Sequence, residues 1–536
     1  MRKTQPAHVS SGAGGLRVLS VLAVAAALAA SLLLSGSTSS AAPAKSHACD
    51  GCPNIFDVFS DATGQVQSAR ADKTLDATNP FFAEDLGKDA QACYDCHQPR
   101  QGFTIQVPSI QSTFDESAGL DSIFATADTA NRPDADVSTI DARRSAFALF
   151  LNLGIVRIGK SQAASDFTAS LKPELVPTFG QEPKPSCTNN DPVQATDCDP
   201  QGLASQTLSL FRRPLVNTNV FFDSAVLWDG RASINNMDAQ VKRAAQTLLL
   251  SETCDAPTSP SPCTPTITPA QEHDIARFMT GVFTSQVSDK ASGPLNGLSA
   301  TGGVVNLVAL AGDPHQPCRT FGGALTVFTP ATCTPAAPPV MSLFNAWAGL
   351  PDSGTNAGRA SVARGQALFN GGAVLHGVPG VTSCSSCHAL NNLGANPSDT
   401  APASFVRLGL DSPDFLARLA AEDGRLASFV SRTSGLPVYN ISGTTCRTLS
   451  DPVSGTVVPN TNTQSTDPGR AMVTGKCADL GGFKPPLLRD VAVRAPYFHN
   501  SAAATLDDVV NFYNARFSIN MTARQHADLV AFLQDL

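Results

Sequence analysis

Apolar residues return at intervals of three and four positions in several stretches of the chain, which is the pattern of helices with one buried face. In the clearest example, Ala146, Leu149, Phe150 and Leu153 follow one another at this spacing. Two other stretches begin with a threonine three residues before a glutamine, as in a capping box. The predicted helices cover residues 142–153 and 237–250 and begin at Thr268, at about Ala357 and at Thr522. A weaker stripe over residues 55–59 also favours a helix.

Segments rich in proline separate these helices and predict long loops; the first is also rich in aspartate, and the second in serine and threonine. They lie at residues 183–200, 254–268 and 311–341. The third of them suggests a linker between two halves of the chain. We therefore expect a mainly α protein, with a signal peptide at residues 1–44, an N-terminal domain at 45–340 and a C-terminal domain at 341–536.

One short motif occurs in each half. Cys93-Tyr-Asp-Cys96-His97 and Cys384-Ser-Ser-Cys387-His388 both read C-x-x-C-H. This is the signature of covalent haem c attachment, in which the thiols bind the porphyrin and the imidazole binds the iron. Disulfides or a zinc site are the alternatives, but zinc requires further Cys or His ligands nearby. The two motifs therefore predict two covalently bound haems, attached through the cysteines and ligated by the histidines.

The other ten cysteines form an even set, and their spacing suggests local disulfide bridges. The expected pairs are Cys49–Cys52, Cys187–Cys198, Cys254–Cys263, Cys318–Cys333 and Cys446–Cys477. Bridges of this kind, like haem c attachment, fit an oxidising compartment outside the cytoplasm.

The first 44 residues agree with export. Arg2, Lys3 and Arg17 precede an apolar run from Val18 to Leu34, and small residues follow, as in a secretory signal. The run is at the short limit for spanning a bilayer, so an uncleaved anchor is the less favoured alternative. The expected location is the periplasm or the cell envelope.

Charge narrows the range of partners. The net charge is −8, and removal of a signal with three basic and no acidic residues makes it −11. This balance argues against binding to nucleic acid but is compatible with a basic protein partner. The sequence leaves the oligomeric state open.

The order of motifs in the chain resembles that of one family. The motifs are C-Y-D-C-H, L-W-D-G-R-A, G-Q-A-L-F-N, C-S-S-C-H, P-P-L-L-R-D-V-A-V-R-A-P-Y-F-H-N and A-D-L-V-A-F-L, between residues 79 and 536. This series is similar to that of the bacterial di-haem cytochrome c peroxidase superfamily, which includes the oxidase that matures methylamine dehydrogenase. The resemblance implies two c-type cytochrome-like haem domains, here with long disulfide-closed loops.

The resemblance also implies roles for single residues. His97 would be the proximal ligand of a haem that reacts with peroxide or oxygen, and His388 that of an electron-transfer haem. Trp228 of L-W-D-G-R-A would relay electrons between the haems; a core tryptophan beside a turn is the alternative. Gln240, the glutamine that follows this motif, would be a second catalytic residue.

Tyr513 stands at the position that separates the subfamilies. In Leu506-Asp-Asp-Val-Val-Asn-Phe-Tyr513-Asn it matches the place where many peroxidases have a methionine ligand and the maturation oxidase has a tyrosine. A tyrosinate stabilises ferric and higher iron states, whereas a thioether favours ferrous iron. Tyr513 is therefore the implied sixth iron ligand at the second haem, with Met472 and Met521 as alternatives.

Two departures from the family concern the first haem. Residues 98–227 contain no histidine, so the distal histidine of resting peroxidases is missing and an open or water-bound iron is implied. The family's distal acid is also missing after Gln240, and Gln246 and Glu252 are the candidates to replace it. Without such an acid, general acid–base help to cleavage of the peroxide O–O bond is weaker.

Calcium is a further open point. The family holds a calcium ion between its domains, but Arg213 and Arg494 stand at the places where its ligands are expected. The resemblance therefore implies that calcium is absent or bound in a different way.

These features lead to one main hypothesis and two alternatives. The main hypothesis is an exported di-haem c-type oxidoreductase that passes electrons through the second haem to hydrogen peroxide or oxygen at the first. A redox protein or an oxidisable substrate would supply the electrons. The alternatives are a non-catalytic di-haem electron carrier and a protein-modifying oxidase or oxygenase on the same scaffold.

Overall fold

The computed structural model describes most of the chain after residue 55. The described residues are 56–70, 78–82, 92–126, 128–132, 135–161, 165–171, 207–223, 225–233, 237–245, 267–311, 319–322, 324–328, 341–373, 375, 382–388, 405–449, 457–459 and 462–536. Residues 46–536 form one compact unit. The predicted signal peptide lies outside the described residues. Among the helices that are described, none is both long and apolar enough to cross a membrane.

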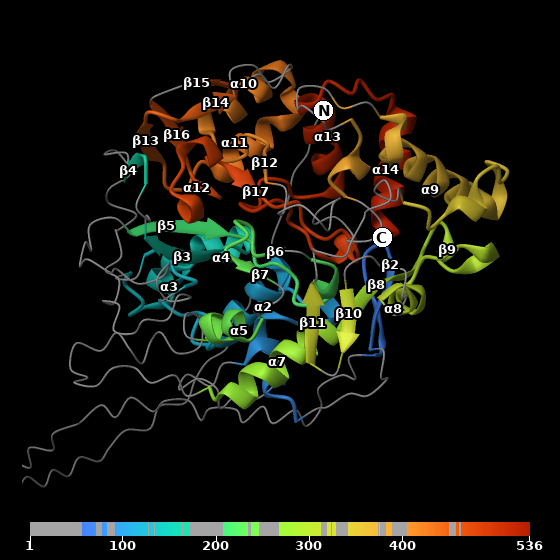
Figure 1. Ribbon diagram of the computed structural model, residues 1–536, viewed down its shortest axis with the longest axis horizontal. Coiled ribbons are helices and arrows are strands. Elements are labelled where there is room, and N and C mark those ends of the chain that lie inside the picture. Colours follow the sequence, from blue (N-terminus) through green and yellow to red (C-terminus); the bar gives the residue numbers. More distant parts are fainter. Residues whose placement is uncertain are drawn as a thin grey trace, which may run out of the picture. The chain divides into compact units, whose positions relative to one another are not determined.

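Helices hold more of the described residues than strands do, in keeping with the predicted mainly α class (Figure 1). The α-helices are α1 (Cys93–Cys96), α2 (Val107–Ser117), α3 (Ile140–Ala146), α4 (Ala148–Leu153), α5 (Met237–Ala244), α7 (Pro269–Gly281), α8 (Val304–Ala311), α9 (Ala357–Ala367), α10 (Pro413–Glu422), α11 (Ala427–Thr433), α12 (Ala471–Thr474), α13 (Leu506–Arg516) and α14 (Ala523–Gln534).

The strands are short, and most of them pair as antiparallel ribbons. They are β1 (Val58–Ser60), β2 (Gly64–Arg70), β3 (Val156–Ser161), β4 (Phe167–Leu171), β5 (Thr207–Arg212), β6 (Ala225–Val226), β7 (Ala232–Ser233), β8 (Val282–Asp289), β9 (Gly293–Pro294), β10 (Arg319–Gly322), β11 (Ala324–Phe328), β12 (Val406–Arg407), β13 (Tyr439–Gly443), β14 (Arg447–Leu449), β15 (Val457–Pro459), β16 (Asn462–Ser465) and β17 (Gly482–Phe483). Two larger sheets have the orders β1-β2-β8-β9 and β16-β13-β4.

The strongest helix signals are confirmed at their predicted starts. The hydroxyl of Thr268 accepts a hydrogen bond from the amide of Gln271 and opens α7, and Thr522 and Gln525 open α14 in the same way. Helix α9 begins at Ala357, as predicted. The predicted helix at 142–153 is divided into α3 and α4, and α5 covers the described part of the helix expected at 237–250.

The weak stripe over residues 55–59 was a wrong prediction. Residues Val58–Ser60 form strand β1, which pairs with β2 so that Phe59 lies opposite Val66. A stripe of a few apolar residues cannot distinguish a helix from a strand, and here the pairing with β2 decides the conformation.

One sheet crosses the expected domain boundary at residue 340. Strand β4 of the first half pairs with β13 of the second, with Ala169 opposite Ile441. Next to it, Cys446 and Cys477 form the disulfide predicted from their spacing. The other four predicted disulfides lie outside the described residues, and the division into two haem domains stays a prediction.

Helices α9 and α14 pack closely in the second half of the chain (Figure 1). A Cβ atom on Gly365 of α9 would lie 2.0 Å from the carbonyl oxygen of Asp528, so only glycine allows this approach. The Asp528 carboxylate also accepts hydrogen bonds from Ser361 and Arg364 of α9. The contact is therefore fixed by both backbone proximity and charge.

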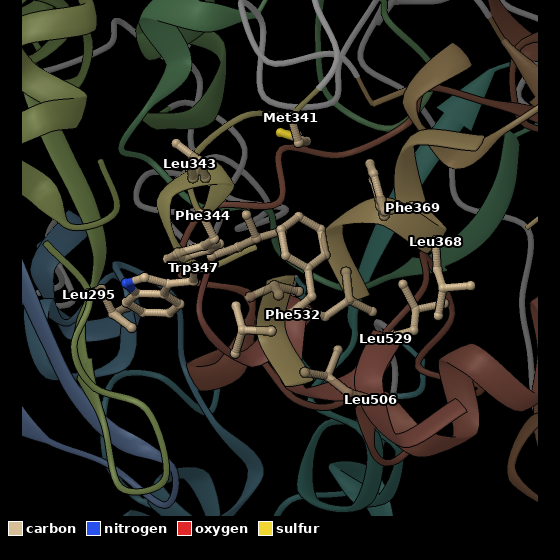
Figure 2. Packing of buried hydrophobic residues seen from close by; sticks show 14 of the residues in the cluster. Leu295, Met341, Leu343, Phe344, Trp347, Leu368, Phe369, Leu506, Leu529 and Phe532 are labelled. Carbon is tan, nitrogen blue, oxygen red and sulfur yellow. The ribbon is translucent and has the colours of Figure 1, made fainter. Parts of the chain in front are cut away.

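A large apolar cluster surrounds this helix pair (Figure 2). Phe532 of α14 packs against Phe369 at 5.3 Å and against Phe344 at 6.1 Å between ring centroids. Phe344 in turn stacks on Trp347. The side chain of Cys384 packs against the same cluster, so the core of the second half extends to the second C-x-x-C-H motif.

Candidate haem sites

The first motif occupies the short helix α1 and the residue after it. The thiols of Cys93 and Cys96 are free, and burial raises the pKa of Cys93 to about 12. Nδ1 of His97 lies 2.8 Å from the carbonyl oxygen of Phe103. A carbonyl can only accept, so Nδ1 carries the proton and Nε2 keeps its lone pair. Burial lowers the pKa of His97 to about 4, which leaves the imidazole neutral and able to bind a metal.

Aromatic rings form the wall next to His97. Phe81 lies 6.5 Å from the His97 ring and 4.6 Å from Phe278 of α7. Phe82 contacts Tyr94 of the motif itself. These residues belong to one apolar cluster that also contains side chains of α5 and α7.

The second motif lies on a 3-10 turn, Cys384–Ser386. Its thiols are also free, and burial raises the pKa of Cys384 to about 12 and that of Cys387 to about 11. Burial lowers the pKa of His388 to about 4, and the nearby Lys484 cation lowers it further. The backbone of Pro486 raises the pKa of His388 and so opposes both effects. Nδ1 of His388 nevertheless meets no partner with hydrogen-bond geometry among the described residues.

The two sites repeat one arrangement of aromatic rings. At the second site, Phe369 lies 6.2 Å from the His388 ring and 5.3 Å from Phe532 of α14. Phe81 takes the corresponding place at the first site, 6.5 Å from His97 and 4.6 Å from Phe278. Phe278 and Phe532 each stand ten positions after the threonine that caps their helix. The two halves thus build the same wall beside their motif histidines.

The residues at both sites fit a covalently bound haem. Both pairs of motif thiols are free, whereas the other two cysteines of the described chain, Cys446 and Cys477, are bridged. Within the described residues, no group of three or more Cys, His, Asp or Glu side chains is placed to hold a metal ion, so the zinc alternative finds no ligand set there. Free, half-buried thiols and a neutral imidazole, with aromatic rings beside them, suit a covalently bound haem c.

Trp228 lies between groups that act on the two motif histidines. Its indole Nε1 donates a 2.7 Å hydrogen bond to the carbonyl of Arg213, whose cation contributes to the low pKa of His97. Its own carbonyl accepts a 2.8 Å hydrogen bond from the amide of Lys484, whose cation acts on His388. The indole is 9% exposed. The backbone thus fixes Trp228 from both sides.

Tyr513 is affected by the thiols of the second motif. Burial raises the pKa of Tyr513, and Cys387 and Cys384 raise it further through their charge. Its ring stacks on Phe517. Of the alternatives, Met472 packs in a separate cluster with Tyr439 and Cys477, whereas Met521 packs against the cluster that includes Cys384. The geometry therefore leaves Tyr513 and Met521 as candidates for the sixth ligand.

Gln240 lies on α5, whose side chains Met237 and Val241 belong to the cluster around the first motif. Its Oε1 atom is buried and has no hydrogen-bond partner among the described residues. This side chain is therefore available to a bound molecule. The proposed substitutes for the distal acid, Gln246 and Glu252, lie outside the described residues.

The two arginines at the expected calcium position bind backbone carbonyls. Arg213 donates to the carbonyls of Ile105, Gly154 and Ala495. Arg494 donates to the carbonyls of Leu487 and Arg489. Both guanidinium groups thus satisfy carbonyl oxygens with a positive charge, as a metal cation would.

Sequence reasoning missed the residues that surround Trp228. His499 lies edge to face with the indole at 6.2 Å and stacks on Phe483 at 3.8 Å. Burial lowers the pKa of His499 to about 3, so it is neutral. The P-Y-F-H-N motif contains His499, but nothing in the sequence indicates that it would contact Trp228, 271 positions earlier.

A buried ionic network supports the same region. Arg212 forms two hydrogen bonds with Asp467 and one with Asp229, which follows Trp228. Against the effect of burial, Arg231 and Arg212 hold the pKa of Asp229 well below its usual range. Breaking a buried pair of this kind by removing one partner is strongly destabilising. The network therefore holds the W-D-G-R turn in place.

Comparison with known proteins gives partial sequence matches. The chain is 29% identical over 192 residues to cytochrome-c peroxidase IdrP1 of Pseudomonas sp. (strain SCT), which covers 34% of this chain and 41% of that protein. It is 38% identical over 81 residues to IdrP1 of Denitromonas iodatirespirans, covering 13% and 22%. It is 40% identical over 70 residues to the cytochrome c551 peroxidase of Nitrosomonas europaea, covering 13% and 21%. Each match spans less than half of the relative's length.

No protein-family model matches the chain. A solved structure described as a MauG-like protein associated with microbial copper homeostasis aligns over 85% of this chain and 87% of its own, with a TM-score of 0.36 and 12% identity. The sequence matches all bear the name of one enzyme class. The chain is therefore similar in sequence to bacterial cytochrome c peroxidases, as the order of its motifs predicted.

Proposed function

We propose that the chain is an exported di-haem c-type oxidoreductase that reduces hydrogen peroxide at the haem of Cys93, Cys96 and His97. Electrons reach this site from the haem of Cys384, Cys387 and His388. The sequence similarity to cytochrome c peroxidases supports the reaction class. Oxygen is the alternative oxidant.

The observation that carries this proposal is the position of Trp228. Its indole donates a hydrogen bond to the backbone carbonyl of Arg213, whose cation lowers the pKa of His97. Its own carbonyl accepts a hydrogen bond from the backbone amide of Lys484, whose cation lowers the pKa of His388. An indole that stood between two haems would shorten the distance that an electron must cross in one step. Trp228 thereby supports a protein with two cooperating sites.

The haem irons supply the electron-transfer chemistry, and the side chains set its conditions. Nε2 of His97 keeps its lone pair because the proton is on Nδ1, which donates a hydrogen bond to the carbonyl oxygen of Phe103. Gln240 offers an unpaired amide oxygen near the cluster of the first motif. Reduction of one hydrogen peroxide to two water molecules consumes two electrons and two protons, so a reduced redox protein or an oxidisable substrate must supply the electrons.

A second candidate function follows from Tyr513. The thiols of the second motif contribute to the raised pKa of Tyr513, and a tyrosinate ligand at that haem would favour oxidised iron. Such a site suits an oxidase that withdraws electrons from a protein substrate, as in the maturation oxidase. This candidate uses the same two haems and differs from the first in the source of electrons.

The proposal is tested on holoprotein made in a host that attaches haem c. Haem content and electron paramagnetic resonance of the oxidised protein are measured together with peroxide-dependent oxidation of a reduced dye. We expect two haems per chain, one high-spin and one low-spin signal, and turnover of the dye. Two low-spin signals without turnover would instead support the electron carrier.

A further inference from the structure

Arg489 carries a buried positive charge, and two of its nitrogen atoms lack a hydrogen-bond partner among the described residues. The residue is 1% exposed. Its Nε and Nη1 atoms are buried and have no hydrogen-bond partner among the described residues. A guanidinium group has five N–H donors and stays charged, so burying it without an anion is strongly unfavourable. This position therefore requires an anionic partner.

The neighbouring carboxylate of Asp490 acts on Arg489 electrostatically but compensates its charge only in part, because the two side chains form no hydrogen bond. Neither oxygen of Asp490 accepts a hydrogen bond within the described structure, and its ion pair is with Nε of Arg494, at 3.2 Å from Oδ1. Burial raises the pKa of Asp490 to about 7, so this group is only partly ionised at neutral pH. Burial lowers the pKa of Arg489 to about 10, which still leaves it a cation. The two side chains are thus not a matched pair.

The chain around Arg489 lines the second motif. Leu488 and Val491 pack in the apolar cluster that contains Phe369 and the side chain of Cys384. Three positions before Arg489, the carbonyl of Pro486 acts on the ring of His388. Arg489 therefore lies in the segment that borders the site of Cys384, Cys387 and His388.

We propose that Arg489 binds a propionate carboxylate of the haem attached to Cys384 and Cys387, which rests on the proposed function as a haem protein. Haem carries two carboxylates, and the planar fork of a guanidinium matches a carboxylate with two parallel hydrogen bonds. A cation bound to a propionate would lie close to the redox centre, where it would favour the reduced iron. Arg489 is thus a cofactor-binding residue that raises the reduction potential of the second haem.

The test uses redox titration of holoprotein, followed by the absorption spectrum. Haem content is measured first, with two haems per chain expected. In Arg489→Gln we expect the equilibrium constant for reduction of the second haem to fall about tenfold, which is about 59 mV for a one-electron couple. Arg489→Lys keeps the charge and should retain most of the potential. The matched control is Arg425→Gln, which removes a positive charge from an exposed pair with Asp423 and should leave the potential unchanged.

The outcomes separate this inference from the function on which it rests. An unchanged potential in Arg489→Gln with both haems bound would overturn the role of Arg489. A wild-type protein without haem at Cys384 and Cys387 would instead refute the proposed function. If the variants do not fold, a crystal structure of the wild-type holoprotein decides. Nε or Nη1 of Arg489 must lie within hydrogen-bonding distance of a propionate oxygen, and a guanidinium facing only protein atoms contradicts the proposal.

Discussion

The two C-x-x-C-H sites share an aromatic wall but differ in the polar groups around it. At each, a phenylalanine lies between the motif histidine and a second phenylalanine on a capped helix. His97 is fixed by a hydrogen bond to Phe103, whereas Nδ1 of His388 makes no full bond within the described structure. The segment that contains Arg489 packs with the core of the second site, and the thiols of that site contribute to the pKa of Tyr513. The repeated wall suits haem binding in general, and the polar differences suit separate roles.

The comparison predicts different losses when either haem is removed. Replacing both Cys93 and Cys96 by alanine should abolish the reaction with peroxide and lower turnover more than about a thousandfold, the scale on which loss of a central catalytic group acts. Replacing Cys384 and Cys387 should stop sustained turnover but leave a single reaction of the first haem with peroxide. Rapid mixing with peroxide and steady-state assays measure the two effects. If the two double variants fail alike in rapid mixing, the division of roles is wrong.

Trp228→Phe should slow electron transfer between the sites. We expect turnover to fall by about tenfold or more, which corresponds to about 1.4 kcal/mol in the barrier, while both haems stay bound. The measurement is the rate at which the second haem is oxidised after peroxide is added. The control is Trp347→Phe, since Trp347 is also buried and donates its indole proton to a backbone carbonyl, that of Gly297. Equal rates in both variants would exclude a relay at Trp228.

Tyr513→Phe tests the ligand that distinguishes the second site. If the tyrosinate binds iron, its loss should change the low-spin spectrum and raise the potential by about 59 mV or more, a tenfold change in the equilibrium constant. Met521→Leu should then leave the spectrum unchanged, and the reverse result would make Met521 the ligand. Tyr439→Phe is the control, because its hydroxyl binds the carbonyl of Ser209 in a separate cluster.

Asp490 follows Arg489 beside the second site and also approaches the first site. A Cβ atom on Gly102, five positions after His97, would lie 2.5 Å from Oδ2 of Asp490. Burial raises its pKa to about 7 in the folded chain, above the usual 3.8. The folded state therefore holds a proton that the unfolded state releases, and this contribution to stability is lost as the pH rises from about 4 to 7.

Asp490→Asn should remove that dependence. The unfolding free energy of the variant minus that of the wild type should rise with pH across this window, by up to about 1.4 kcal/mol for each pH unit. Asparagine also tolerates the positive φ of 58° at this position. Denaturant unfolding of both proteins at pH 5 and pH 7.5 measures the difference, and an equal difference at the two values contradicts a buried, protonated Asp490.

Local patterns allowed the motifs and the capped helices to be predicted, because both depend on residues a few positions apart. Thr268 and Thr522 cap α7 and α14 as expected, and Cys446 pairs with Cys477. Contacts between segments far apart in the chain could not be predicted from such local patterns. Three features depend on tertiary packing: the pairing of β4 with β13, the stacking of Phe483 on His499, and the lack of hydrogen bonds to Nε and Nη1 of Arg489 among the described residues. The roles of Trp228, Gln240 and Tyr513 came from family resemblance and stay predictions.

If the first site is open to peroxide and the second supplies electrons, the two haems should respond to peroxide in a fixed order. Stopped-flow mixing of the holoprotein with hydrogen peroxide measures this order. We expect a rapid spectral change at a high-spin haem, followed by oxidation of the low-spin haem, and loss of the first change when Cys93 and Cys96 are replaced. The absence of any reaction at the high-spin haem would show that this division of roles is wrong.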